Sequence, residues 1–241
     1  MFEIHIYDTY DQVSDKAFEV MKEVITSNPS AILGLATGSS PIGLYKRLLE
    51  DHKSNQTSYK DIVTYNLDEY VGIAQNHEQS YYTFMNDHFF RHIDIQKKNI
   101  HMPIGVSSDL RAYADNYELE LQEHVQDIQL LGIGSNGHIG FNEPGTSFES
   151  GTHIVDLKKQ TRIDNARFFD TLEDVPMQAM TMGIHDILRA KKILLIATGE
   201  KKAHVVFGMI KGPITEAVPC SILQKHPHVI VILDRAAAKE L

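Results

Sequence analysis

The sequence predicts an α/β protein built in three layers, with a doubly wound, mostly parallel sheet that carries helices on both faces in a Rossmann-like arrangement. Two observations support this prediction. Short apolar runs alternate along the chain with longer segments that have the periodicity of amphipathic helices. The runs are also continuously apolar instead of alternating with polar residues, which is typical of parallel strands covered on both faces.

The predicted strands and helices follow one another in regular order. We expect strands at residues 2–7, 31–36, 62–66, 128–133, 193–197 and 229–233. We expect helices at residues 10–27, 41–49, 80–92, 110–125, 177–190 and 201–210. Pro41 and Pro176 each stand where a helix would begin, a position at which proline loses no hydrogen bond.

The length of 241 residues allows one large domain or two small ones, at roughly 150 residues per domain. There is no repeat, low-complexity segment or Ser/Gly linker, so we expect a single domain over residues 1–241. Residues 134–175 are the least regular part and are rich in Gly, Asn, Ser and Thr. Long irregular segments in compact domains are often functional.

The charge and composition exclude several classes of partner. With 23 Lys+Arg against 32 Asp+Glu the net charge is −9, which disfavours nucleic acid and anionic membrane surfaces. No apolar stretch approaches a membrane span, and the N-terminus lacks the pattern of a signal peptide. The single cysteine, Cys220, cannot form an internal disulfide, so we expect a reducing compartment, the cytoplasm.

The first candidate site is a turn rich in Gly, Ser and Thr between a predicted strand and a helix. Backbone N–H groups, hydroxyls and the helix dipole of such a turn suit a phosphate group. An ordinary helix cap explains the same residues, and both interpretations remain open. No lysine follows the second glycine, so the turn is not a P-loop. Its residues are Thr37, Gly38, Ser39 and Ser40.

The second candidate is a pair of acids, Asp68 and Glu69, just after the strand at 62–66. In open α/β sheets ligands bind at the carboxyl ends of the strands, where a carboxylate can act as a general base. Successive side chains of an extended segment point in opposite directions, so only one of the two could face a ligand. By themselves the two acids favour a solvated turn.

The third candidate follows the strand at 128–133. Gly132 to Gly137 match GxGxxG, but Gly140, Pro144 and Gly145 interrupt the helix that a dinucleotide-binding fingerprint must open. We therefore reject a dinucleotide site.

The same loop also contains Asn136, His138 and Glu143. A histidine beside a carboxylate is typical of an oriented acid–base catalyst. The chain has 13 histidines, so His138 stands out only through its loop and its neighbours.

Basic residues near these loops are few. Arg162 and Arg167 lie in the irregular segment, and Lys201 and Lys202 follow the strand at 193–197. Each could bind a phosphate or be a solvated surface charge. The sequence has no Cys/His pattern typical of a zinc site, and the best interpretation of Cys220 is a buried, inert thiol.

Four motifs in this order resemble the glucosamine-6-phosphate deaminase (isomerase) family. They are ATGSSP at 36–41, NLDEYVG at 66–72, GHIGFNEP at 137–144 and NARFF at 165–169, and the resemblance extends from about residue 31 to 234. The pairing of the second motif with the third is specific. The related 6-phosphogluconolactonases have the fold and a glycine-rich histidine loop but lack the FNEP continuation.

The resemblance implies an enzyme of amino-sugar catabolism, a single sugar-phosphate isomerase/deaminase domain. It converts glucosamine 6-phosphate and water to fructose 6-phosphate and ammonia, without a metal or an organic cofactor. It implies that Asp68 transfers the proton from C2 to C1 and that His138 opens the sugar ring with Glu143 as its partner. The implied phosphate site comprises the Ser39–Ser40 turn, Arg167 and Lys202.

Two departures from the family pattern matter. Asn136 stands where many relatives have an aspartate, so we expect it to orient the His138–Glu143 pair by hydrogen bonds only. Activated hexameric relatives have a basic pair and a C-terminal extension, whereas His153 and Val155 stand here and the chain stops at Leu241. We therefore expect a non-allosteric monomer whose partner is a small sugar phosphate.

Two alternatives belong to other classes. A sugar-phosphate lactonase of the same fold would need no C2 base and would release no ammonia. A non-catalytic sugar-phosphate sensor usually has an attached DNA-binding segment, for which this chain has neither the length nor a basic stretch. Residues 146–161 are the candidate lid.

Overall fold

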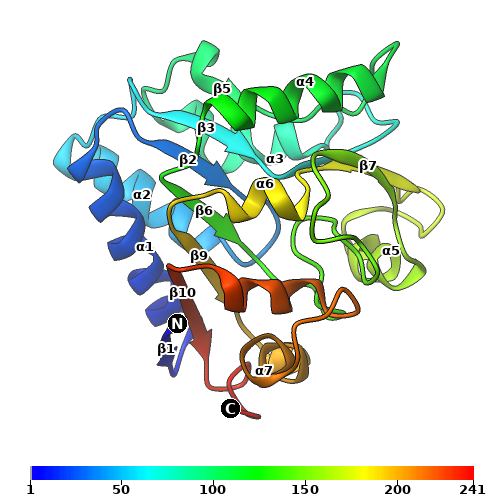
Figure 1. Cartoon of the computed structure of the whole chain (residues 1–241). Coiled ribbons are helices and arrows are strands. Elements are labelled where there is room, and N and C mark those ends of the chain that lie inside the picture. Colours follow the sequence, from blue (N-terminus) through cyan, green and yellow to red (C-terminus); the bar gives the residue numbers. More distant parts are fainter. Residues whose placement is uncertain (1) are drawn as a thin grey trace.

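A parallel sheet forms the centre of the computed structural model, which describes residues 2–241 (Figure 1). Within these residues the sheet has seven strands in the order β1-β10-β9-β6-β2-β3-β5. The strands are β1 (Phe2–Tyr7), β2 (Ile32–Leu35), β3 (Val63–Asn66), β5 (Ile100–His101), β6 (Ile128–Leu131), β9 (Ile193–Ala197) and β10 (Val229–Asp234).

The sheet is doubly wound, as predicted. The chain adds β2, β3 and β5 outward in one direction, then returns beside β2 and adds β6, β9 and β10 in the other. Right-handed crossovers place α1, α2 and α3 on one face and α4, α6 and α7 on the other. The helices are α1 (Tyr10–Ser27), α2 (Ile42–Asn55), α3 (Tyr81–His88), α4 (Leu110–Glu123), α5 (Lys159–Asn165), α6 (Ile184–Leu188) and α7 (Ala203–Lys211).

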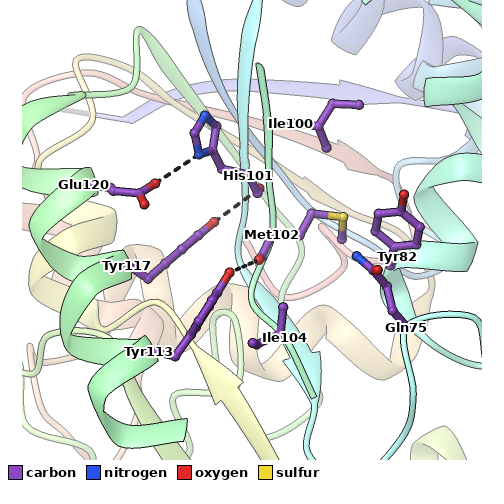
Figure 2. A pocket seen from close by; sticks show the side chains of 9 residues that line it. All are labelled: Gln75, Tyr82, Ile100, His101, Met102, Ile104, Tyr113, Tyr117 and Glu120. Atoms are coloured by element: carbon purple, nitrogen blue, oxygen red, sulfur yellow. Dashed lines mark hydrogen bonds and ion pairs between the residues drawn. The ribbon is translucent and has the colours of Figure 1, made fainter. Parts of the chain in front are cut away.

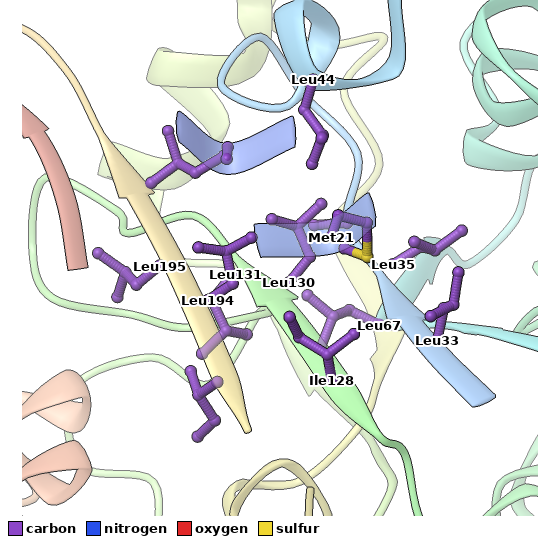
Figure 3. Close-up of a cluster of buried hydrophobic side chains, with 14 of the residues drawn as sticks. Met21, Leu33, Leu35, Leu44, Leu67, Ile128, Leu130, Leu131, Leu194 and Leu195 are labelled. Carbon is purple, nitrogen blue, oxygen red and sulfur yellow. The ribbon is translucent and has the colours of Figure 1, made fainter. Parts of the chain in front are cut away.

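The central strands are apolar on both faces, which is why they read as continuous apolar runs. Figure 3 shows Leu130 and Leu131 of β6 between the leucines of β9 and those of β2. Helix α1 begins at a capping box formed by Thr9 and Gln12, and its buried positions recur every three or four residues to face this core.

The predicted helix at 177–190 is wrong. Its first part is strand β8 (Gln178–Thr181), and only its second part is helical, as α6. Strand β8 pairs on one side with β4 (Asp68–Tyr70) and on the other with β7 (His153–Asp156), both antiparallel. This second sheet was not predicted, because β4 has only three residues and its partners lie far away in the chain. Such strands leave no periodic pattern in the sequence.

Other differences are local. Residues 134–175 contain β7 and α5, so this segment and the candidate lid at 146–161 are less irregular than expected. Pro41 occupies the cap position of α2 instead of its first turn, and Pro176 precedes a strand. Edge strand β5 was missed because it has two residues. Short 3₁₀ turns cover Phe90–His92, Lys97–Asn99, Ala166–Phe168, Glu200–Lys202 and Pro219–Lys225.

In the part of the chain that the structure describes, no helix combines the length and apolarity needed to span a bilayer.

Gly183, between β8 and α6, offers a test of how the second sheet is held. A Cβ at this position would lie 2.0 Å from the carbonyl oxygen of Ser150 and 2.2 Å from that of Gly151. We expect Gly183→Ala to lower the free energy of unfolding by about 1–3 kcal/mol, because backbone has to move to accommodate the methyl group. Urea denaturation measures this change.

The matched control is Gly208→Ala in α7, where the nearest atom to an added Cβ is 3.8 Å away. Alanine is the better helix former, so this variant should be neutral or up to ~1 kcal/mol more stable. Equal destabilisation by the two variants would contradict the assigned role of Gly183.

Candidate active site

The two directions of winding meet between β2 and β6, the position at which open α/β sheets bind ligands. The loops that follow these strands face each other there. A Cβ on Gly132, just after β6, would lie 4.0 Å from the Oγ of Ser40, after β2. In Figure 1, β7 and α5 lie on the side toward which the arrows of β2 and β6 point, so they flank this edge.

The loop after β2 turns at Gly38, whose φ of +90° favours glycine. Tyr10 of α1 supports the turn, because its Oη accepts a hydrogen bond from the Gly43 N–H (2.8 Å) and lies 3.0 Å from the Ser39 carbonyl oxygen. No side chain caps α2 from its cap position. Among the described residues none forms a hydrogen bond with the hydroxyl groups of Thr37, Ser39 or Ser40. These hydroxyls can therefore bind a ligand without first breaking a hydrogen bond to a described residue.

The loop after β6 is a tight turn that holds the ring of His138 against Gly134. The Gly134 N–H donates to the His138 carbonyl (2.9 Å), and a Cβ on Gly134 would lie 2.2 Å from the imidazole. Gly137 has a φ of +90°. The glycines of the GxGxxG match therefore shape a histidine turn and not a dinucleotide-binding loop.

Glu143 is buried beside this turn and accepts several hydrogen bonds. Asn136 donates through Nδ2 to Oε2 (2.7 Å), while Thr161 Oγ1 and the Lys158 N–H (3.3 Å) donate to Oε1. The Oδ1 of Asn136 accepts from the His138 N–H (3.2 Å). The Nδ1 of His138 lies 3.8 Å from Glu143 Oε2, an ion-pair separation longer than a hydrogen bond. Asn136 thus links the carboxylate to the histidine backbone.

Burial lowers the pKa of His138 and the ammonium of Lys202 lowers it further, while the carboxylates of Glu143 and Asp164 act to raise it. A histidine with a lowered pKa is mostly neutral at neutral pH, so one ring nitrogen can accept a proton while the other donates one.

Asp68 and Glu69 are 7% and 2% exposed, so the solvated turn favoured by the two acids alone is wrong. The Glu69 carboxylate accepts from the N–H groups of Tyr70, Tyr81 and Tyr82, all at 2.9–3.0 Å, and so holds the start of α3. Asp68 points the other way. Burial and the neighbouring charge of Glu69 raise the pKa of Asp68 to about 8, within the range of a general base.

The second sheet brings Asp68 to the histidine loop. Asp68 pairs with Thr181 of β8, and the Thr181 Oγ1 accepts from the Phe141 N–H (3.0 Å) of the loop. A Cβ on Gly140 would lie 3.7 Å from Asp68 Oδ2. Buried Asn142 adds a second connection by donating to the carbonyls of Ile139 (2.9 Å) and Met182 (2.8 Å).

Of the basic residues singled out in the sequence, Lys202, Lys201 and Arg167 act on one another electrostatically, whereas Arg162 has a structural role. Lys202 is half-buried, and burial together with Arg167 and Lys201 lowers its pKa, whereas Asp164 acts to raise it. Arg167 is exposed on the turn after α5. Arg162 is not part of this group, because its guanidinium donates to the carbonyls of Leu172 and Val175 and so anchors α5.

Sequence reasoning missed four polar residues of this region. Thr161 and Asn142 hold Glu143 and the loop, while Ser135 and Asp164 are hydrogen-bonded across the site (2.8 Å). Ser135 and Asn142 lie within motifs that were singled out, but nothing in the local sequence separates Thr161 and Asp164 from ordinary polar residues.

A cavity of about 190 Å³ lies at the β5 edge of the sheet, lined by Tyr82 of α3 and by Tyr113, Tyr117 and Glu120 along α4 (Figure 2). None of the residues predicted for the site lines it. Cys220 is buried below the histidine loop, where its N–H donates to the Gly137 carbonyl (2.9 Å) and burial raises the pKa of the thiol to about 12. Among residues 2–241, no three His, Cys, Asp or Glu side chains are grouped to hold a metal ion.

Comparison with known proteins shows which family the chain resembles. The family model described as glucosamine-6-phosphate isomerases/6-phosphogluconolactonase matches residues 7–231. The chain is 46% identical over 230 residues to a glucosamine-6-phosphate deaminase of Thermoanaerobacter pseudethanolicus, covering 95% of this chain and 91% of the relative. It is 48% identical over 233 residues to one of Halalkalibacterium halodurans, covering 96% and 95%.

Solved structures give the same picture. A monomeric glucosamine-6-phosphate deaminase superposes with a TM-score of 0.97 at 44% identity, covering 99% of this chain and 100% of that one. A 6-phosphogluconolactonase from Trypanosoma brucei superposes with a TM-score of 0.84 at 19% identity, covering 100% and 99%, and shares the fold. On this evidence the chain belongs to the glucosamine-6-phosphate isomerase/6-phosphogluconolactonase family.

Proposed function

We propose that this chain is a glucosamine-6-phosphate deaminase, which converts glucosamine 6-phosphate and water to fructose 6-phosphate and ammonia. The observation that carries the proposal is the position of Asp68, a buried carboxylate with a pKa of about 8 beside the histidine loop. A lactonase needs no base to remove a proton from C2, whereas an aldose–ketose isomerisation requires one. The relatives of 46–48% identity named above support the same choice.

The first step is opening of the sugar ring. In this proposal His138 moves a proton between O1 and the ring oxygen, which breaks the bond from C1 to that oxygen and leaves an aldehyde at C1. Its mostly neutral imidazole suits this task because it can accept one proton and donate another. Glu143 stabilises the imidazolium that forms transiently, and Asn136 orients the pair through its two hydrogen bonds.

The second step is the transfer of hydrogen from C2 to C1. The Asp68 carboxylate removes the C2 proton while the aldehyde oxygen O1 takes up the proton that the substrate's ammonium group releases, which gives an enolamine. Asp68 then returns its proton to C1, which leaves a hydroxymethyl group at C1 and an iminium group at C2. Water adds to this carbon and ammonia leaves, so the ketone of fructose 6-phosphate forms. One carboxylate serves both carbons because they are adjacent, and burial keeps its pKa high enough to act as a base.

The phosphate group is the handle that positions C2 against Asp68. We assign it to the turn of Thr37, Gly38, Ser39 and Ser40, together with Arg167 and Lys202. The hydroxyls of the turn, the start of α2 and the two cations suit a dianion. Binding energy from this remote group can orient the reacting carbons.

The proposal extends to assembly and location. We infer a monomeric, non-allosteric enzyme of one domain that acts in the cytoplasm. The similarity to a structure described as monomeric supports the monomeric state. His153 and Val155 of β7, which stand in place of a basic pair, support the absence of allosteric activation.

The activity is tested by incubating the protein with glucosamine 6-phosphate and a chelator. We expect ammonia and fructose 6-phosphate in equal amounts. Asp68→Asn should reduce exchange of the C2 proton by roughly 10²–10⁴-fold and leave sugar-phosphate binding nearly intact.

Asp61→Asn, an exposed acid outside the site, is the control and should keep full activity. Hydrolysis of 6-phosphogluconolactone without ammonia release would favour the lactonase instead. Undiminished exchange in Asp68→Asn would mean that the base is misassigned.

The pH dependence of kcat/KM offers a second test. The base must be ionised, and its pKa in the free enzyme is raised to about 8, so kcat/KM should rise with pH and level off above that value. The substrate phosphate is already a dianion there, since its second pKa is about 6. A kcat/KM that is already constant from pH 6 upward would contradict a raised pKa at Asp68.

Asn136→Asp tests whether the His138–Glu143 pair works equally well beside a neutral amide and beside a carboxylate. The new carboxylate would face Glu143 at the distance of the present 2.7 Å hydrogen bond, so one of the two should take up a proton. We expect the acidic limb of the pH–rate profile to move upward and kcat to change by less than about tenfold, or ~1.4 kcal/mol. A rise in kcat of tenfold or more would show that the native amide of Asn136 limits proton transfer by the His138–Glu143 pair.

A further inference from the structure

Asp164 joins α5 to the histidine loop. Its Oδ2 accepts a hydrogen bond from Ser135 Oγ (2.8 Å), and Ser135 belongs to the same turn as Asn136 and His138. Its Oδ1 accepts from Gln160 Nε2 (2.9 Å), one turn earlier on α5. The carboxylate is thus held from both sides at a defined place between the helix and the loop.

The carboxylate is charged at neutral pH. Burial acts to raise the pKa of Asp164, but the hydrogen bonds from Ser135 and Gln160 and the charges of Lys202 and His138 hold it below its usual value. The ionised carboxylate of Asp164 can therefore act on the charges of Lys202 and His138.

The charges around Lys202 and His138 make this position significant. Lys202 faces two like charges, Arg167 and Lys201, and Asp164 is the carboxylate that opposes them. His138 faces the positive charge of Lys202 and the negative charges of Glu143 and Asp164. Asp164 therefore acts both on Lys202, the lysine assigned to phosphate binding, and on His138, the histidine assigned to ring opening.

Asn136 explains why a second carboxylate is needed. Its neutral amide occupies the Oε2 of Glu143 by a 2.7 Å hydrogen bond, and the same oxygen lies 3.8 Å from His138. The loop that bears His138 thus provides a single negative charge, that of Glu143, and Glu143 also accepts a hydrogen bond from Asn136. Asp164 brings another from α5.

We propose that Asp164 is a positioning residue: held by Ser135 and Gln160, it ties α5 to the histidine turn and places a fixed negative charge near Lys202 and His138. This role rests on the proposed function, because it acts through residues assigned to ring opening and phosphate binding. Asp164 itself touches no reacting atom in this scheme.

The test is Asp164→Asn, which keeps the size of the side chain and removes its charge. In the substrate-free protein, an NMR titration of the His138 ring, identified by its loss in His138→Gln, should show ionisation about 0.5 pH unit lower than in the wild type. Lys202 should also lose its proton more readily in this variant, so we expect KM for glucosamine 6-phosphate to rise at a lower alkaline pH than in the wild type.

Three further variants separate charge from structure. Asp164→Glu should restore most of both shifts. Ser135→Ala keeps the charge and should give less than half of either shift. Asp170→Asn removes an exposed acid from the same segment that does not act on His138 or Lys202, and should give none.

Equal shifts in Asp164→Asn and Asp170→Asn, or no shift in Asp164→Asn, would overturn the role of Asp164. If the wild type released no ammonia, the proposed function would fail. The His138 titration would still decide the role of Asp164, because it needs no substrate.

Discussion

The antiparallel pairing of β4 with β8 is the interaction on which the site depends. It removes Asp68 from water, places it opposite Thr181, and lets the Thr181 hydroxyl hold the loop that bears His138. Without this pairing, Asp68 and His138 would be side chains on two separate loops at the edge of the main sheet. The raised pKa of Asp68 has the same origin, because burial is its largest cause. Position and reactivity are thus set by one contact between segments more than 100 residues apart in the chain.

Glycine has a particular task in this arrangement. Gly134 allows the imidazole of His138 to lie against the backbone, and Gly140 allows the loop to approach the Thr181 hydroxyl, which would lie 2.8 Å from an added Cβ. A methyl group at Gly134 would collide with the His138 ring, and one at Gly140 would press on the hydroxyl that connects the loop to β8. These two glycines therefore allow the loop to pack against β8 with the imidazole in its observed position.

The electrostatics are local and not global. A net charge of −9 repels a sugar phosphate at long range, so the proposed phosphate site relies on the nearby groups Arg167, Lys202 and the start of α2. These two cations also repel each other, and the carboxylate of Asp164 moderates that repulsion at Lys202. Such a site favours specificity by close contact over steering from a distance.

The sequence by itself determined the main sheet and the loops that matter. Continuous apolar runs and periodic helices are local signals, so the strands at 2–7, 193–197 and 229–233 and the helix at 10–27 are recovered with the right class and closely matching ends. The motifs likewise identified the loops around Thr37, Asp68 and His138 as candidates, because their residue types carry recognisable chemistry.

Only the tertiary structure decided what joins these loops. The short strands β4 and β7, and β8 within an apparently helical segment, gain their conformation from pairing with distant residues and leave no periodic trace. The same holds for burial of Asp68, the separate capping role of Glu69, and the contact of Asp164 with Ser135. A residue type indicates which chemistry is available, but pKa values and partners depend on burial and distance, and these are properties of the folded chain.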